Sequence, residues 1–421
     1  MAQVNLSTSD MRVAIDIGST VVKVAEFDGD DILARQQLYP RDFDCGIEKQ
    51  IISLLGKYPA MSDVRICSSA NGGLRVGVVC LTQLFSGSVF RNQVLSAGAN
   101  PIYVHDFEKT DGDLRPVDVL LVGGGINCAD AGPLRARLDH FSANKYRYNI
   151  IMYAGNADLA SSFVEKYPDA VVIDNPLADE LTGKRQSVSK VLREAYLLDL
   201  VYKEGVSGLG RLVRHAIRAT PEVVSRGFRR VMSNRSSFEV SGPTILIDIG
   251  GATTDIHYTV EIIRRDSEVK PPTGSSIARY VFTDLGIVAS RDTTLLQIRS
   301  HPRTFEFLGR VMPKEVRETY VSLREGEYNP SPTLMAYACL FLCLDRFTLG
   351  RGPGLPTADL DRVAQIILTG GGGQALDEDV VAGITRLFPS DERNDPLVII
   401  DRDYRIWAEG MMLATNLSGF D

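Results

Sequence analysis

A short motif rich in glycine and hydroxyl side chains occurs twice in this chain, with an offset of 248 − 16 = 232 residues. Each copy follows a short apolar run, at 13–15 and 245–247, and so indicates a buried strand that ends at an Asp and continues into a tight turn. Two such units point to an internal repeat of long period. The copies are Asp16-Ile17-Gly18-Ser19-Thr20, followed by Lys23, and Asp248-Ile249-Gly250-Gly251-Ala252-Thr253-Thr254-Asp255.

Both turns have the composition of a phosphate-binding loop. Glycine lets backbone N–H groups come close to an anion, and hydroxyls add further donors. A carboxylate at the end of the strand can hold hydrated Mg²⁺. Neither loop is a Walker sequence or a G-x-G-x-x-G sequence. An ordinary strand-turn remains the alternative for either copy alone, but the recurrence favours two loops that face one ATP molecule.

The residues of the two loops can be given hypothetical roles. Asp16 and Asp248 are the candidate ligands of Mg²⁺, while Lys23 could offset phosphate charge. Asp255 could orient the attacking water, with a structural cap as the alternative. The candidate phosphate donors are Gly18, Ser19, Thr20, Gly250, Gly251, Thr253 and Thr254.

A third glycine-rich segment follows the apolar run 363–368. Close packing against an adenosine is one interpretation of this segment, and a flexible loop is the other. Its candidate cofactor-binding residues are Gly370, Gly371, Gly372 and Gly373.

Composition limits the class of protein. The 421 residues are enough for two domains with a core each, and the net charge of −7 argues against a general nucleic-acid binder. The first ten residues lack a signal-peptide pattern, and no membrane partner is expected from the apolar runs. The six cysteines are scattered and form no C-x-x-C pair, which predicts reduced thiols and a cytoplasmic location.

The middle of the chain differs from the two ends. Residues 63–174 alternate strand and helix patterns, which predicts a mostly parallel sheet, and the turn at 123–125 suits either close approach to a ligand or a tight crossover. Residues 182–235 are expected to be helical and carry twelve Lys and Arg against four Asp and Glu. This excess indicates either a solvated face or a docking surface for an acidic partner protein.

The order of these motifs resembles that of the actin, sugar kinase and heat-shock chaperone ATPase superfamily. Within it, the chain is similar to the GlmL/MutL-type accessory proteins of adenosylcobalamin-dependent glutamate mutase. The similarity is carried mainly by 16–20, by the Asp248–Asp255 string with His257, and by Thr369-Gly370-Gly371-Gly372. Shorter matches occur at 153–156, 193–195, 220–221 and 284–286.

The resemblance implies an α/β fold with two RNase-H-like, actin-like domains and a nucleotide cleft between them. The first domain is expected at 1–240, with the βα insertion at about 63–174 and the helical segment at about 182–235. The second is expected at 241–421, with its last helix possibly packing back on the first.

The function implied by the resemblance is that of a slow Mg²⁺-dependent ATPase that reactivates or assembles a cobalamin-dependent mutase, as a chaperone. The client could be glutamate mutase, a related carbon-skeleton mutase or an aminomutase. A small-molecule kinase of the same superfamily is one alternative, with Asp130 or Asp174 as catalytic candidate by position. A non-enzymatic actin-like scaffold is the other.

Overall fold

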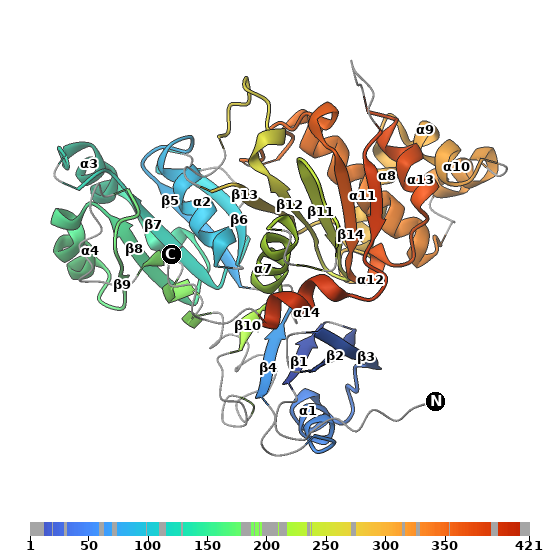
Figure 1. Cartoon of the computed structure of the whole chain (residues 1–421). Coiled ribbons are helices and arrows are strands. Elements are labelled where there is room, and N and C mark those ends of the chain that lie inside the picture. Colours follow the sequence, from blue (N-terminus) through green and yellow to red (C-terminus); the bar gives the residue numbers. More distant parts are fainter. Residues whose placement is uncertain are drawn as a thin grey trace. The chain divides into compact units, whose positions relative to one another are not determined.

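The protein is described by a computed structural model, shown in Figure 1. The description covers residues 12–18, 20–28, 32–58, 63–69, 74–97, 99–108, 115–127, 129–177, 187–188, 190–192, 194–195, 209, 217–233, 236, 238–270, 275–313, 316–325, 329–352, 354–388 and 395–412. The chain divides into two compact units. Unit 1 comprises 1–72, 202–351 and 356–421, and unit 2 comprises 73–201 and 352–355.

The first sheet of unit 1 has five strands in the order β10-β4-β1-β2-β3. β1 pairs antiparallel with β2, β2 pairs antiparallel with β3, and β4 runs parallel to both β1 and β10. The strands are β1 (Arg12–Ile17), β2 (Val21–Asp28), β3 (Ile32–Pro40), β4 (Asp63–Ser68) and β10 (Arg218–Ala219), and helix α1 (Ile47–Leu55) joins β3 to β4.

The second sheet of unit 1 repeats this order as β13-β12-β11-β14-β15. β11 pairs antiparallel with β12 and parallel with β14, as β1 does with β2 and β4. Numbered along the chain, both sheets have the order 3-2-1-4-5, which is the RNase-H-like arrangement. The predicted actin-like fold class is therefore confirmed. The strands are β11 (Thr244–Ile249), β12 (Thr254–Thr259), β13 (Ile277–Phe282), β14 (Gln365–Thr369) and β15 (Leu397–Ile400).

Helices of unit 1 surround the second sheet. The most apolar is α11 (Pro332–Leu349), which begins at the Ser331 N-cap and ends at Gly350 in the left-handed conformation. By length and hydropathy α11 is the one helix in the described ranges that could cross a membrane, but 72% of it is buried inside the protein, as in a core helix. The others are α8 (Arg291–Ser300), α9 (Thr304–Val311), α10 (Val316–Glu325), α12 (Gly370–Gly373) and α13 (Glu378–Thr385), with the short 3₁₀ turns η4 (Val260–Ile262) and η5 (Leu360–Arg362).

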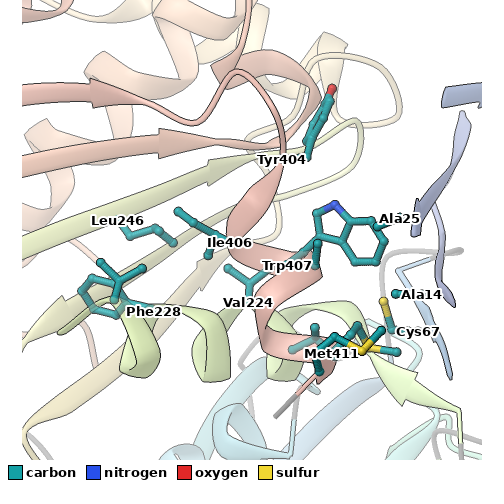
Figure 2. Packing of buried hydrophobic residues seen from close by; sticks show 14 of the residues in the cluster. Ala14, Ala25, Cys67, Val224, Phe228, Leu246, Tyr404, Ile406, Trp407 and Met411 are labelled. Carbon is teal, nitrogen blue, oxygen red and sulfur yellow. The ribbon is translucent and has the colours of Figure 1, made fainter. Parts of the chain in front are cut away.

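Two helices of unit 1 each follow the fifth strand of a sheet: α7 (Thr220–Met232) follows β10, and α14 (Arg405–Met412) follows β15. They share one core with both sheets. In Figure 2, Trp407 packs beside Ala25 of the first sheet, and Ile406 lies near Leu246 of the second. The helices touch through their backbones, since a Cβ at Gly227 would lie 2.0 Å from the Ile406 carbonyl oxygen and one at Gly410 2.1 Å from that of Val223. Only glycine fits at this crossing.

Unit 2 contains a separate five-stranded sheet that is parallel throughout, in the order β6-β5-β7-β8-β9. This is the 2-1-3-4-5 order of a doubly wound fold. The elements are β5 (Arg75–Cys80), α2 (Ser86–Ser96), β6 (Asn100–Asp106), β7 (Val119–Gly124), α3 (Gly132–His140), η2 (Ala143–Lys145), β8 (Ile150–Gly155), η3 (Ala157–Leu159), α4 (Ala160–Lys166) and β9 (Val171–Val172).

The predicted parallel sheet is therefore confirmed from β5 to β9, but the strand at its predicted start, 63–68, is β4 and pairs with β1 in the first sheet of unit 1. Its glycine turn is a tight crossover: a Cβ at Gly124 would lie 2.8 Å from Leu81, and one at Gly123 would lie 2.8 Å from the backbone of Ala154. Most of the basic segment 182–235 lies outside the described residues, so its predicted docking role is not tested. The division at residue 240 also stays a prediction.

Candidate functional site

Asp16, the repeated Asp of the first copy, is fully buried near the end of β1 and accepts three hydrogen bonds. Its donors are the Thr220 hydroxyl at 2.6 Å, the Lys23 ammonium at 2.7 Å and the Cys67 thiol at 3.4 Å. Burial raises the pKa of Cys67 well above its ordinary value, so this thiol stays a neutral donor. The carboxylate is therefore held in one orientation by groups from three different segments.

Lys23 lies between the two halves of the repeat. Burial alone would lower its pKa, but Asp16 and Asp248 together raise it above the ordinary value. The ammonium also lies 4.8 Å from the ring centroid of Tyr404 and 5.8 Å from that of Trp407, both within cation–π range. One cation thus interacts with the carboxylates of both loops and with aromatic rings at the start of α14.

Asp248, the counterpart of Asp16, carries a raised pKa of about 7. The main cause is burial, which Lys23 opposes, while the neighbouring carboxylates of Asp255 and Asp16 raise the pKa further. Asp248 therefore sits near the midpoint of its titration at neutral pH. A divalent cation that binds here would favour the ionised form.

The two loops have the same backbone turn. The Gly18 N–H donates to the Val21 carbonyl at 3.0 Å, and the Gly250 N–H donates to the Thr253 carbonyl at 2.9 Å. Ser19 lies outside the described residues, while Thr20 is exposed in the turn. The Thr254 hydroxyl is buried and donates to the Leu285 carbonyl at 3.2 Å, so its hydrogen bond is made within the protein interior.

Asp255 is buried in an ion pair with Arg279 of β13, whose Nε donates to it at 2.8 Å. Its second oxygen accepts from the Thr253 hydroxyl at 3.2 Å. These bonds agree with the structural alternative for Asp255 and leave its proposed contact with water untested. His257, on the same strand, is also fully buried, with Nδ1 3.0 Å from the Ser225 hydroxyl of α7.

The run Gly370–Gly373 forms the single turn α12, in place of a flexible loop. Gly370 has φ +82°, and a Cβ there would lie 2.1 Å from Oδ1 of Asp248. A Cβ at Gly372 would lie 2.6 Å from the Ile249 side chain. These glycines bring the start of α12 against the second acidic loop, at Asp248 and Ile249.

Several residues of the site were not identified from the sequence. Thr220 is the first residue of α7, after the N-cap Ala219, and its hydroxyl donates to Asp16. Arg41, just after β3, donates from Nη1 to the Gly18 carbonyl at 2.9 Å. No local motif marks Arg41 or Tyr404, because both come near the loops only through tertiary packing.

The candidate carboxylates of the kinase alternative and the repeated loops belong to different units. Asp130 and Asp174 belong to unit 2, whereas the repeated loops belong to unit 1. The Asp130 carboxylate accepts a hydrogen bond from the Gly132 N–H at 2.8 Å at the start of α3. This contact is an Asx turn that precedes α3, whose N-cap is Ala131.

The carboxylates around Lys23 suit the coordination that Mg²⁺ prefers. Among the described residues there is no group of three or more His, Cys, Asp and Glu that could hold a metal ion. Mg²⁺ differs from transition metals in keeping several waters and using one or two carboxylates together with phosphate oxygens. The pair Asp16 and Asp248 fits that donor set.

A duplicated RNase-H-like sheet with matching acidic loops defines an actin-like protein of the class that includes sugar kinases and chaperone ATPases. The model of the MutL protein family matches residues 12–415, and this chain belongs to that family. The resemblance drawn from the motifs is thereby confirmed. Protein MutL of Clostridium tetanomorphum is 23% identical over 266 residues, a match that spans 59% of this chain and 57% of the relative.

Solved structures give weaker likenesses. Component A of the (R)-2-hydroxyglutaryl-CoA dehydratase of Acidaminococcus fermentans is 9% identical, with 96% of each chain covered and a TM-score of 0.33. A ROK family glucokinase from Streptomyces griseus, in complex with glucose and AMPPNP, is 11% identical, with 95% and 97% covered and a TM-score of 0.33. The fold assignment rests on the strand order and not on these scores.

Proposed function

We propose that this protein binds Mg-ATP between the two loops of unit 1 and hydrolyses it slowly, as the motor of an accessory protein that reactivates or assembles an adenosylcobalamin-dependent mutase. The observation that supports it most is the shared cation: Lys23 bonds to Asp16 and is stabilised electrostatically by Asp248. Carboxylates from two loops 232 residues apart (248 − 16 = 232) therefore act on one point in space.

The nucleotide would be held by the groups already described. Asp16 and Asp248 would take hydrated Mg²⁺, and backbone N–H groups of both loops with the Thr20 hydroxyl would meet the β- and γ-phosphates. Gly370 to Gly373 would receive the adenosine. Lys23 would then exchange part of its bond to Asp16 for contact with phosphate oxygens, since both are anionic partners of a buried ammonium.

Slow turnover follows from the chemistry of these side chains. Phosphoryl transfer depends mainly on positioning and on stabilisation of charge. The carboxylate of Asp255 is committed to Arg279 and to the Thr253 hydroxyl, and Asp16 accepts three bonds. Such carboxylates orient their neighbours more readily than they accept a proton from water.

Coupling to a client would use the helices that follow the fifth strands. Lys23 lies over Tyr404 and Trp407, and α14 touches α7 at Gly227 and Gly410. A phosphate that draws Lys23 away from these rings would alter the seating of α14 between the two sheets. A ligand with different affinity for two arrangements shifts the protein between them.

The test of nucleotide binding is calorimetric titration of Mg-ATP into the wild type, Asp16→Asn and Asp248→Asn. Each substitution should weaken binding about tenfold or more, because a charge-assisted ligand of Mg²⁺ is lost. Asp266→Asn is the matched control, since Asp266 is exposed and pairs with Arg264. Unchanged affinity in both loop variants would show that the nucleotide site is elsewhere.

The accessory role needs a separate measurement. A mutase inactivated by turnover should regain activity when this protein, Mg-ATP and fresh adenosylcobalamin are added, and the Asp16→Asn variant should fail to restore it. Recovery at the same rate with no protein, or with ADP in place of ATP, would contradict the reactivating role while leaving ATP binding intact.

A further inference from the structure

Unit 2 contains a groove that the nucleotide chemistry of unit 1 does not use. Its volume is about 560 Å³, and polar atoms form the larger part of its lining. Arg75 lies at the start of β5, and the segment Tyr146–Asn149 leads into β8. The groove thus lies at the amino ends of the parallel strands.

Its position argues against a site for a cofactor. In open parallel sheets, small ligands bind beyond the carboxyl ends of the strands. Small-molecule pockets are also lined mainly by apolar side chains and enclose most of the ligand. Here Asn144, Arg147 and Asn149 are exposed around a polar lining. A groove of this kind is better suited to part of a macromolecule.

The walls of the groove are held firmly in place. The Asp118 carboxylate, 2% exposed, accepts from the Arg75 Nη2 at 2.8 Å and Nε at 3.1 Å. The Val117 N–H donates to the Arg147 carbonyl at 2.9 Å. The Tyr146 ring lies 6.1 Å from that of Tyr103. A preformed surface loses little conformational entropy on binding.

The charge of the groove indicates the charge of the partner that it would bind. No Asp or Glu lines the groove, and the Asp118 carboxylate beneath it is paired with Arg75. The exposed carboxylate of Asp169 lies near the lining residue Tyr148, so it is set against the two cations that follow. Arg147 is exposed and has no ion pair or side-chain hydrogen bond with any residue in the described part of the chain. Lys145, also exposed, precedes the lining residue Tyr146. The groove therefore presents positive charge on a protein whose net charge is −7.

We propose that this groove binds an acidic segment of a partner protein, with carboxylates at Arg147 and with Tyr146 and Tyr148 providing flat contact area. Tyr and Arg are the residues that most often carry binding energy at protein interfaces. Tyr also offers a large contact surface at low entropic cost, while Asn supplies adaptable hydrogen bonds. The proposal is independent of nucleotide binding, because every lining residue belongs to unit 2.

The test is fluorescence anisotropy of labelled peptides of about eight residues, long enough to span such a groove, with the full chain and no nucleotide. The probes are a set of Glu-rich peptides with one Tyr or Leu each, the matching Lys-rich peptides, and a single-stranded oligonucleotide. At least one Glu-rich peptide should bind the wild type, and the affinity should fall as salt is added.

Two variants locate the binding. Arg147→Glu should weaken the Glu-rich peptide about tenfold, because an attraction is replaced by a repulsion. Arg135→Glu is the matched control, since Arg135 is an exposed arginine on α3 of the same unit and does not line the groove. Tyr148→Ala should weaken binding without removing the salt dependence.

Four outcomes would overturn the proposal. They are no binding of any Glu-rich peptide, equal effects of Arg147→Glu and Arg135→Glu, tighter binding of the oligonucleotide, and loss of binding only on Lys184→Glu and Arg185→Glu in the basic segment. Circular dichroism of each variant would show that a loss of binding is not a loss of fold.

Discussion

The two copies of the loop hairpin share a backbone but differ in charge. Across the first hairpin, β1 residue Asp16 lies opposite Lys23, whereas across the second, Asp248 lies opposite Asp255. The position seven residues after the repeated Asp is thus a cation in one copy and an anion in the other. Directly opposed side chains in an antiparallel pair are close neighbours, so this substitution determines how each carboxylate is neutralised.

The consequence is a division of roles. In the first copy the hairpin neutralises itself, since Lys23 bonds to Asp16. In the second copy Asp255 takes its counter-charge from Arg279 on the third strand, and Asp248 depends on the Lys23 of the other copy. A repeat with identical halves would place four carboxylates together. Because of this sequence difference, Lys23 of the first copy supplies the counter-charge for Asp248 of the second.

The loops are also fastened differently. In the first, the Arg41 side chain donates to the Gly18 carbonyl and its N–H donates to that of Thr20, both at 2.9 Å, while the Ser68 hydroxyl and the Ser69 N–H donate to the Ile17 carbonyl at 3.0 Å. The second is held by the segment after β13, where the Val288 N–H donates to the Gly251 carbonyl at 2.8 Å and the Ser290 hydroxyl donates to that of Ala252 at 2.6 Å.

The largest expected effect concerns the ion pair of the second copy. Asp255→Ala should lower the free energy of unfolding by about 3–5 kcal/mol, because it leaves the Arg279 guanidinium buried without its carboxylate. The double variant Asp255→Ala/Arg279→Met should recover part of this loss, as measured by urea unfolding. Additive losses in the double variant would mean that the pair does not act as a unit.

The crossing of α7 and α14, which follows the fifth strand of each copy, should tolerate no side chain. Gly410→Ala should cost about 2–3 kcal/mol, since its Cβ would lie 2.1 Å from the Val223 carbonyl oxygen. Gly309→Ala in α9 is the control, with nothing within 4 Å of the added Cβ, and should stabilise by about 0.5–1 kcal/mol. Equal thermal shifts in the two variants would disprove the tight crossing.

Because different hydrogen bonds hold the two loops, we expect unequal losses of stability when one side chain is removed from each. Arg41→Ala should lower the free energy of unfolding by about 1.5–2 kcal/mol, because a charged donor is lost. Ser290→Ala should lower it by about 1 kcal/mol, because the second loop keeps its backbone bonds. Chemical denaturation of both variants checks this order, and a larger loss for Ser290→Ala would reverse the comparison.

The last effect is one of pH and concerns Asp248. Its pKa is raised to about 7 in the folded protein from an ordinary value of 3.8, so the folded state holds a proton that the unfolded state releases. Its contribution to stability should therefore fall as pH rises between these values. Affinity for Mg-ATP should change in the opposite sense and rise about tenfold between pH 6 and pH 8, because Mg²⁺ requires the ionised form.

Asp248→Asn separates this effect from other titrations. The variant should lose both the fall in stability and the gain in Mg-ATP affinity over the same pH range, as measured by unfolding and by calorimetry. A pH profile of stability identical to that of the wild type would place the titrating group elsewhere.

Much of the fold could be read from local patterns. The apolar runs before each Asp became β1 and β11, and the alternating segments from β5 onward became the parallel sheet of unit 2, whereas the strand at 63–68 joined the first sheet of unit 1. These predictions succeeded because hydrophobic periodicity and glycine turns are local properties of the chain.

The site was predicted less completely. The loop residues could be predicted because glycine and Asp after an apolar run form a local sequence pattern that indicates a strand followed by a tight turn. Thr220 and Arg41 could not, because each reaches the loops from a strand or helix end that is distant in sequence. Tyr404 gave no signal either, although it is the one non-glycine residue in the described ranges with positive φ, at 50°.

The sequence alone determined the repeat, its two acidic loops and the class of fold that such a duplication allows, since strand patterns and turn glycines act within a few residues. Tertiary structure decided which charges meet. Lys23 serves both copies, Asp255 is bound to Arg279, and α7 and α14 touch at Gly227 and Gly410. Electrostatic and packing energies depend on distance in space, and separation along the chain does not specify that distance.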